Sequence, residues 1–119
     1  MSDCCILGLG YIGLPTAVIL ANSGHRVFGV DINPQIVDKV NKGISHFVEN
    51  DLDKILTKVS ISGRLTAHTK PVQADVFIIT VPTPLKKTKG KKLPQPDLEN
   101  VFQATKSLAP LLRPGNLVV

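Results

Sequence analysis

A glycine-rich turn between two apolar segments constrains the fold of this chain more than any other feature. The turn follows the pattern GxGxxG, with Gly8, Gly10 and Gly13 as its glycines. The apolar run over residues 4–9 predicts a buried parallel strand, and the mostly apolar residues 12–23 predict a helix directly after the turn. A strand that enters a helix through glycines is typical of the first half of a βαβ unit.

The segments that follow continue this alternation. Residues 26–30 predict a second strand, and Asn33 followed by Pro34 predicts the N-cap and first turn of a helix that stops at Gly43. Further along, the sequence predicts a helix over 51–59, a strand over 75–81, a helix over 97–109 and the start of a strand over 116–119. The whole pattern predicts an α/β fold of the Rossmann type, a doubly wound parallel sheet in three α/β/α layers.

Length and composition are those of one ordinary globular domain. The chain has 119 residues, of which 43% are hydrophobic and 19% are charged, enough for a single core and too few for two. No apolar run is long enough to span a bilayer and no secretion signal is visible, so we expect a cytoplasmic location and no membrane partner. Because the chain stops inside a predicted strand, we expect residues 1–119 to be the N-terminal part of a longer protein.

The glycine turn also predicts a ligand when it is combined with Asp31. An acid at the end of the second strand, about 20 residues after the glycines, completes the fingerprint of dinucleotide-binding βαβ units. Gly8 permits the tight turn, Gly10 lets the backbone approach a pyrophosphate, and Gly13 lets the helix pack closely on the strand. The helix N-terminus adds free N–H groups and a partial positive charge. A glycine turn without a ligand is the alternative.

Asp31 bears on the choice between NAD and NADP. A carboxylate at this position can accept hydrogen bonds from both hydroxyls of a ribose, and it repels a 2′-phosphate. Ile32 and Asn33 stand where an NADP site often places an arginine. The sequence therefore predicts NAD as the cofactor. The alternative role for Asp31 is that of a strand-end acid or a helix cap.

Several longer motifs resemble those of a known enzyme family. These motifs are GLGYIGLPTA, GVDIN, NKGISHFVENDL, TVPTP and PDLENVFQATKSLAPLLRPGNLVV. They resemble the UDP-glucose/GDP-mannose dehydrogenase family, and within it most of all the UDP-N-acetyl-mannosamine 6-dehydrogenases. The combination of YIGLPTA and VPTP is much more specific than GxGxxG alone. The resemblance covers nearly the whole chain and implies an NAD-binding domain.

The resemblance implies which residues contact NAD. Tyr11 and Ile12 match positions that offer backbone amides near the pyrophosphate, while Asp31 and Thr83 match further contact positions. Thr83 follows the predicted strand over 75–81, at the sheet edge where open α/β folds place their ligands. A turn residue between two prolines is the alternative for Thr83.

The resemblance further implies a two-step oxidation in polysaccharide biosynthesis. The C6 hydroxyl of a UDP-sugar, UDP-N-acetyl-mannosamine above all, becomes a carboxylate through an enzyme-bound thioester, and two NAD+ are consumed. The family's catalytic cysteine and lysine lie beyond Val119, and full-length relatives form homo-oligomers. Neither Cys4 nor Cys5 matches that cysteine. Because they are neighbours in a predicted core strand, we expect buried, unpaired thiols, with no metal site and no catalytic residue in this chain.

The chain departs from the family pattern in three places. Ile36 replaces a basic residue that some relatives place near the adenosine ribose, and Asn50 stands where proline is common. A loop before the last predicted helix is unusually basic, either as solvated surface or as an electrostatic guide for an anionic nucleotide sugar. Its lysines are Lys86, Lys87, Lys89, Lys91 and Lys92.

The net charge of +5 does not indicate a nucleic-acid partner. Five of the 14 basic residues belong to this loop, and the remaining nine (14 − 5) balance the nine acidic residues. No aromatic residue lies among these lysines to stack on bases, so we expect no nucleic-acid binding. A stand-alone NAD(H)-binding or sensing module without catalysis is the alternative function.

Overall fold

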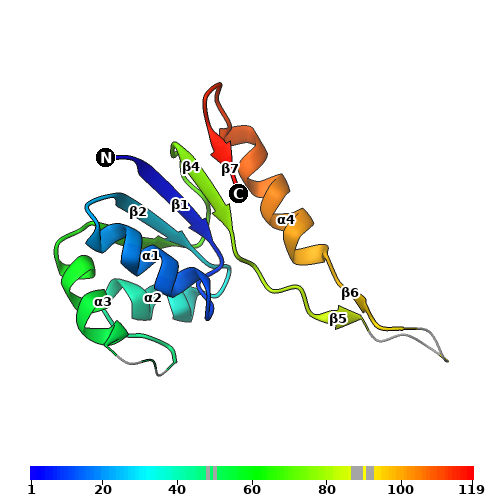
Figure 1. Cartoon of the computed structure of the whole chain (residues 1–119), viewed down its shortest axis with the longest axis horizontal. Coiled ribbons are helices and arrows are strands. Elements are labelled where there is room, and N and C mark those ends of the chain that lie inside the picture. Colours follow the sequence, from blue (N-terminus) through cyan, green and yellow to red (C-terminus); the bar gives the residue numbers. More distant parts are fainter. Residues whose placement is uncertain (48, 50, 87–89, 91–92) are drawn as a thin grey trace.

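The computed structural model describes residues 1–47, 49, 51–86, 90 and 93–119. Within this part of the chain, five parallel strands form one sheet in the order β3-β2-β1-β4-β7. The strands are β1 (Asp3–Leu7), β2 (Arg26–Val30), β3 (Leu65–His68), β4 (Val76–Ile79) and β7 (Leu117–Val118). The sheet grows outward from β1 to β3, and the chain then crosses back to place β4 on the other side of β1 (Figure 1). The parallel pairing of β1 with β2 confirms the predicted βαβ unit.

Helices cover both faces of this sheet, as the sequence predicts (Figure 1). Three helices pack on one face: α1 (Gly13–Asn22), α2 (Pro34–Asn41) and α3 (Leu52–Ile61). The other face is covered by α4 (Glu99–Leu108), which continues into the 3-10 turn η1 (Ala109–Leu111). The Rossmann-type α/β/α layering is thereby confirmed.

Two apolar cores lie on opposite faces of the sheet. Successive side chains of a strand point to opposite faces, so Cys4 and Ile6 enter the core under α1, α2 and α3, while Cys5 and Leu7 enter the core under α4. The fully buried Phe77 is the largest side chain of this second core. Both thiols are unpaired, and burial raises the pKa of each. The expected buried core cysteines are confirmed.

Local signals set the ends of the helices. The side-chain oxygen of Asn33 accepts a hydrogen bond from the Gln35 N–H at 3.0 Å, and Pro34 takes the first turn of α2. These are the predicted cap and the predicted first-turn proline. Gly24 and Gly43 follow α1 and α2 with φ of 103° and 75°, a left-handed conformation that ends a helix without the Cβ penalty.

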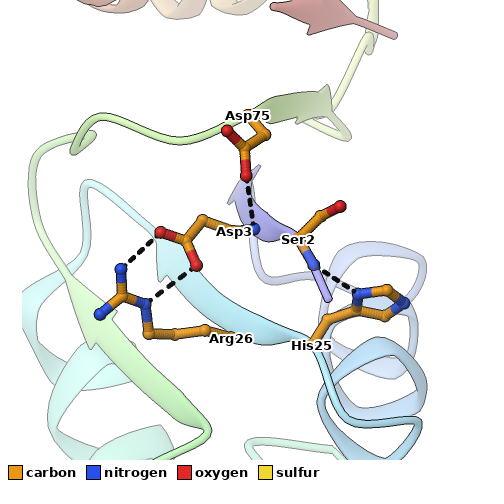
Figure 2. A network of polar contacts seen from close by, with 5 residues as sticks. All are labelled: Ser2, Asp3, His25, Arg26 and Asp75. Carbon is orange, nitrogen blue, oxygen red and sulfur yellow. Dashed lines mark hydrogen bonds and ion pairs between the residues drawn. The ribbon is translucent and has the colours of Figure 1, made fainter.

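A polar network joins the amino-terminal ends of β1 and β2 to the residue before β4 (Figure 2). The glycine turn lies at the other, carboxyl end of β1. Arg26 donates to the Asp3 carboxylate through Nε at 3.0 Å and Nη2 at 2.5 Å. The Asp3 N–H donates to Asp75 at 2.9 Å, and the Ser2 N–H donates to His25 Nδ1 at 3.1 Å. The hydrogen bonds from Arg26 lower the pKa of Asp3. The network ties β1 to β2 and to the segment before β4.

The structure differs from the sequence prediction in three places. The sequence does not predict β3, whose four residues LTAH are too few to show a clear period. A short antiparallel hairpin, β5 (Leu85–Lys86) with β6 (Gln95–Pro96), stands within a predicted loop and projects away from the sheet (Figure 1). β1 ends at Leu7 because Gly8, with φ of 100°, leaves the extended conformation. Every other predicted element begins and ends within two residues of its predicted position.

Candidate cofactor-binding site

A cleft of about 950 Å³ opens at the carboxyl ends of β1, β2 and β4. The strand order reverses beside β1, since β2 lies on one side of it and the later β4 on the other. Open α/β sheets bind ligands at such a reversal. The glycine turn lines the cleft together with residues 30–33 at the end of β2, 69–71 after β3 and 80–83 after β4, and with one face of α4.

The three glycines of the turn meet different surroundings. A Cβ on Gly8 would lie 2.7 Å from the carbonyl oxygen of Thr80, and one on Gly13 would collide with the carbonyl oxygen of Gly8. In contrast, a Cβ on Gly10 would meet no atom of the described residues within 4 Å. Gly8 and Gly13 are therefore required by packing, whereas Gly10 leaves its backbone open to the cleft. This is the geometry expected where a backbone must admit a ligand.

The start of α1 places unpaired backbone N–H groups at the cleft. The hydrogen bond from the Leu14 N–H to the Gly10 carbonyl (3.1 Å) opens the helical ladder, and no side chain in the described part of the chain caps this end of the helix. No described residue accepts a hydrogen bond from the N–H groups of Gly10, Tyr11 or Ile12. Such N–H groups, at the positive end of a helix dipole, suit the oxygens of a phosphate or pyrophosphate.

Asp31 follows β2 directly and is half-buried beside the glycine turn. Its Oδ2 accepts a hydrogen bond from the Leu9 N–H at 3.1 Å, and its Oδ1 accepts one from the Asn33 N–H at 2.9 Å. Because a carboxylate has about four acceptor positions, two positions remain for ribose hydroxyls. The alternative role of a strand-end acid is thus realised in the structure, and it is compatible with ligand binding.

Tyr11 and Ile12 line the cleft and are 77% and 69% exposed. The Tyr11 ring packs against Phe47, with ring centroids 4.7 Å apart. His46 stands edge-on to Phe47, and its Nε2 lies 2.5 Å from the Leu9 carbonyl oxygen. The segment that follows α2 therefore packs against the glycine turn.

Two threonines follow β4 at the far end of the cleft. The Thr80 Oγ1 lies 2.8 Å from the Gly8 carbonyl oxygen and so ties the end of β4 to the glycine turn. Thr83 is exposed and lines the cleft. Asn100 of α4 donates a hydrogen bond to the Pro82 carbonyl at 3.0 Å, which fixes the backbone next to Thr83.

The structure brings most of the predicted site residues to this single cleft. Six of the seven line it: Gly8, Gly10, Tyr11, Ile12, Asp31 and Thr83. Gly13 lies beneath the turn instead, where it lets α1 approach β1. The structure shows that these residues lie together, and their contacts with a cofactor stay a prediction.

Sequence reasoning missed lining residues that other elements contribute. Residues 69–71 follow β3, a strand that the sequence does not predict, and they line the cleft. Lys70 therefore places a basic side chain on the cleft. Ile36, which replaces a basic residue of some relatives, lines the same cleft. Asn100, Gln103 and Ser107 line the cleft from α4. Their spacing of three and four residues marks one polar face of a helix, and this signal could have identified them.

Two features of the sequence analysis fall outside the described residues. One is Asn50, and the other is most of the basic loop, because residues 87–89 and 91–92 hold four of its five lysines. The fifth, Lys86, is exposed in β5. Within the described ranges, the helices are all too short or too polar to cross a membrane.

Comparison with known proteins places the chain in a family. The family model for the NAD-binding domain of UDP-glucose/GDP-mannose dehydrogenases matches residues 2–119. A UDP-N-acetyl-D-mannosamine dehydrogenase of Campylobacter jejuni is 49% identical over 115 residues, which is 97% of this chain and 27% of that protein. An NDP-N-acetyl-D-galactosaminuronic acid dehydrogenase of Ralstonia nicotianae is 47% identical over 96% of this chain and 26% of that protein. The chain thus spans about a quarter of the length of these relatives.

Solved structures share the fold closely. A UDP-N-acetyl-mannosamine dehydrogenase from Staphylococcus aureus superimposes with a TM-score of 0.91 at 40% identity, over 98% of this chain and 28% of that one. A ternary complex of GDP-mannose dehydrogenase from Pseudomonas aeruginosa matches with a TM-score of 0.79 at 32% identity, over 88% of this chain and 24% of that one. The matches agree with the α/β architecture and its parallel sheet.

Proposed function

The chain belongs to the UDP-glucose/GDP-mannose dehydrogenase family as its NAD-binding domain, and we propose that NAD binds in the cleft at the carboxyl ends of β1, β2 and β4. The observation that carries this proposal is the open backbone at Gly10, where a Cβ would meet no atom within 4 Å among the residues that the structure describes. The N–H groups of residues 10–12 have no acceptor among the described residues. An anionic pyrophosphate suits both features.

The other contacts follow from the positions of the strands. Asp31, at the end of β2, would accept hydrogen bonds from the hydroxyls of the adenosine ribose, and its charge would repel a 2′-phosphate. Thr83 follows β4, on the other side of β1, and so would lie toward the nicotinamide half of the cofactor. NAD supplies the hydride acceptor, and these residues bind and orient it.

We further propose that the protein oxidises the C6 hydroxyl of a UDP-sugar to a carboxylate, with UDP-N-acetyl-mannosamine as the leading substrate. Support comes from the names of the C. jejuni and S. aureus relatives, both UDP-N-acetyl-mannosamine dehydrogenases. The relatives are about four times as long as this chain, so the sugar site and the catalytic groups would lie in regions that the relatives have in addition.

Cofactor titration of the chain tests the proposed site. Calorimetry should show NADH binding with a lower dissociation constant than NADPH, because Asp31 accepts from a free ribose and opposes a phosphate on it. Equal affinities would contradict the role given to Asp31. The absence of NADH binding would contradict the proposed site altogether.

A further inference from the structure

The segment after α2 carries a residue that the proposed function does not use. His46 is half-buried, and its Nε2 lies 2.5 Å from the Leu9 carbonyl oxygen. A carbonyl oxygen can only accept, so Nε2 carries the proton and donates. The imidazole stands perpendicular to the Phe47 ring, at a centroid distance of 4.8 Å. Ser45 braces the same short segment, with its Oγ 2.6 Å from the Phe47 carbonyl oxygen.

The accepting carbonyl belongs to the peptide between Leu9 and Gly10. This peptide is trans, so its C=O and the N–H of Gly10 point in opposite directions. A bond that holds the C=O toward His46 therefore directs the Gly10 N–H away from His46. That N–H has no acceptor among the described residues, and Gly10 lines the cleft.

The rest of Leu9 is fixed by other contacts. Its N–H donates to Asp31 at 3.1 Å, and its side chain is fully buried against Gly29, where a Cβ would come within 2.9 Å of Leu9 Cδ2. These contacts place the residue itself. On the other side of the peptide plane that follows, the Gly10 carbonyl accepts a hydrogen bond from the Leu14 N–H at 3.1 Å. The hydrogen bond from His46 is the described contact made by the C=O of the plane itself.

We propose that His46 is a positioning residue for phosphate binding, which holds the Leu9–Gly10 peptide so that the Gly10 N–H is directed at the pyrophosphate of the cofactor. The inference rests on the proposed NAD site and adds a residue to it. A donor that is already oriented loses little conformational entropy when the ligand binds, so the ligand binds more tightly. We expect removal of the bond to weaken binding about tenfold, the equivalent of one ordinary hydrogen bond.

Three variants separate the donor from the ring. His46→Phe keeps an aromatic ring against Phe47 and removes the donor, whereas His46→Gln restores an N–H at nearly the same reach. His25→Phe is the matched control, because His25 lies in the polar network at the amino-terminal ends of β1 and β2 (Figure 2). Calorimetry with ADP-ribose probes the pyrophosphate, and an NMR titration with adenosine probes the ribose and base without any phosphate. Thermal melting followed by circular dichroism verifies folding.

The expected result is selective. His46→Phe should raise the dissociation constant of ADP-ribose about tenfold and that of adenosine less than about twofold. In His46→Gln, the dissociation constant of ADP-ribose should return to within about threefold of the wild-type value. In His25→Phe, both dissociation constants should be unchanged. Equal losses for both probes, or no loss for ADP-ribose, would overturn the inference while leaving the NAD site standing. A wild-type chain that does not bind ADP-ribose would overturn the proposed function instead. If His46→Phe does not fold, the wild-type chain still tests the hydrogen bond on which the inference depends. The bond predicts an NMR coupling between His46 Nε2 and the Leu9 carbonyl carbon, and the absence of this coupling would overturn the inference.

Discussion

At the scale of single residues, the glycine turn uses one residue type for two different purposes. Gly8 and Gly13 face backbone oxygens that leave no room for a Cβ, whereas Gly10 faces open space. Packing therefore requires two of the glycines, and access to the cleft accounts for the third. Substitution by alanine can separate the two purposes, because one affects the free energy of unfolding and the other affects ligand binding.

Gly13→Ala should destabilise the fold by about 1–3 kcal/mol, the usual range for forcing extra atoms into a packed region. Gly10→Ala should change the free energy of unfolding by less than roughly 0.5 kcal/mol, as surface substitutions usually do, since an added Cβ meets no described atom within 4 Å and Gly10 has no positive φ. Yet Gly10→Ala should weaken NADH binding at least tenfold, because a methyl group would occupy the space of the pyrophosphate. Urea unfolding and calorimetry measure the two effects. A Gly10→Ala chain that binds NADH like the wild type would refute the access argument.

Asp31→Ala should weaken NADH binding by about 1–3 kcal/mol, the range for losing hydrogen bonds to a charged acceptor. It should also reduce the preference over NADPH, because the charge that opposes a 2′-phosphate is gone. The substitution frees the Leu9 N–H as well, so the free energy of unfolding should fall slightly. Asp38→Ala is the control, because Asp38 is an exposed acid of α2 that pairs with Lys42. Unchanged cofactor preference in Asp31→Ala would count against the ribose contact.

At the scale of elements, a local pattern is predictive where it is long and clearly punctuated. β1 and α1 are mostly apolar and meet at the glycine turn, β2 lies between Gly24 and Asp31, and the sequence predicts all three. β3 has four residues, only two of which, Leu65 and Ala67, reach the core. Its structure depends on parallel pairing with β2, a partner that no local pattern reveals.

The candidate site divides in the same way. The glycine turn and Asp31 belong to one contiguous motif, so the sequence alone predicts that they lie together. Lys70 reaches the cleft because β3 ends at that edge of the sheet, and Gln103 reaches it because α4 passes the same edge. Their contribution depends on the strand order β3-β2-β1-β4-β7, which follows from long-range packing and not from spacing along the chain.

The cap of α2 gives a prediction at this scale. Asn33→Ala removes the side-chain oxygen that accepts from the Gln35 N–H at 3.0 Å, so the free energy of unfolding should fall by about 1 kcal/mol. Gln35→Ala, at the same helix end, keeps the capped N–H and should change stability by less than roughly 0.5 kcal/mol. Urea unfolding of both variants is the measurement. Equal stability of Asn33→Ala and the wild type would show that the cap contributes nothing.

At the scale of the whole molecule, cofactor binding and catalysis should be separable. The proposed reaction needs a thiolate nucleophile, and the two cysteines are buried in the cores with raised pKa values, which suppresses the thiolate and denies it a substrate. The chain should therefore bind NADH but produce none from NAD+ with UDP-N-acetyl-mannosamine or UDP-glucose. Absorbance of NADH, with a full-length relative assayed in parallel, is the measurement. Sustained NADH production by this chain would show that its catalytic residues have been misidentified.

The adjacent cysteines can also report local unfolding on each face of the sheet, because Cys4 lies in one core and Cys5 in the other. A thiol reagent reaches a buried cysteine only when the layer above it lifts, so labelling of Cys5 in a Cys4→Ala chain times the lifting of α4. Labelling of Cys4 in a Cys5→Ala chain times the lifting of the opposite layer. Among the described residues, the core under α4 has six buried members and the other core has fourteen, so α4 should lift more often than the opposite layer. Two neighbouring residues thus report the opening of opposite faces of the same sheet, each through its own labelling rate.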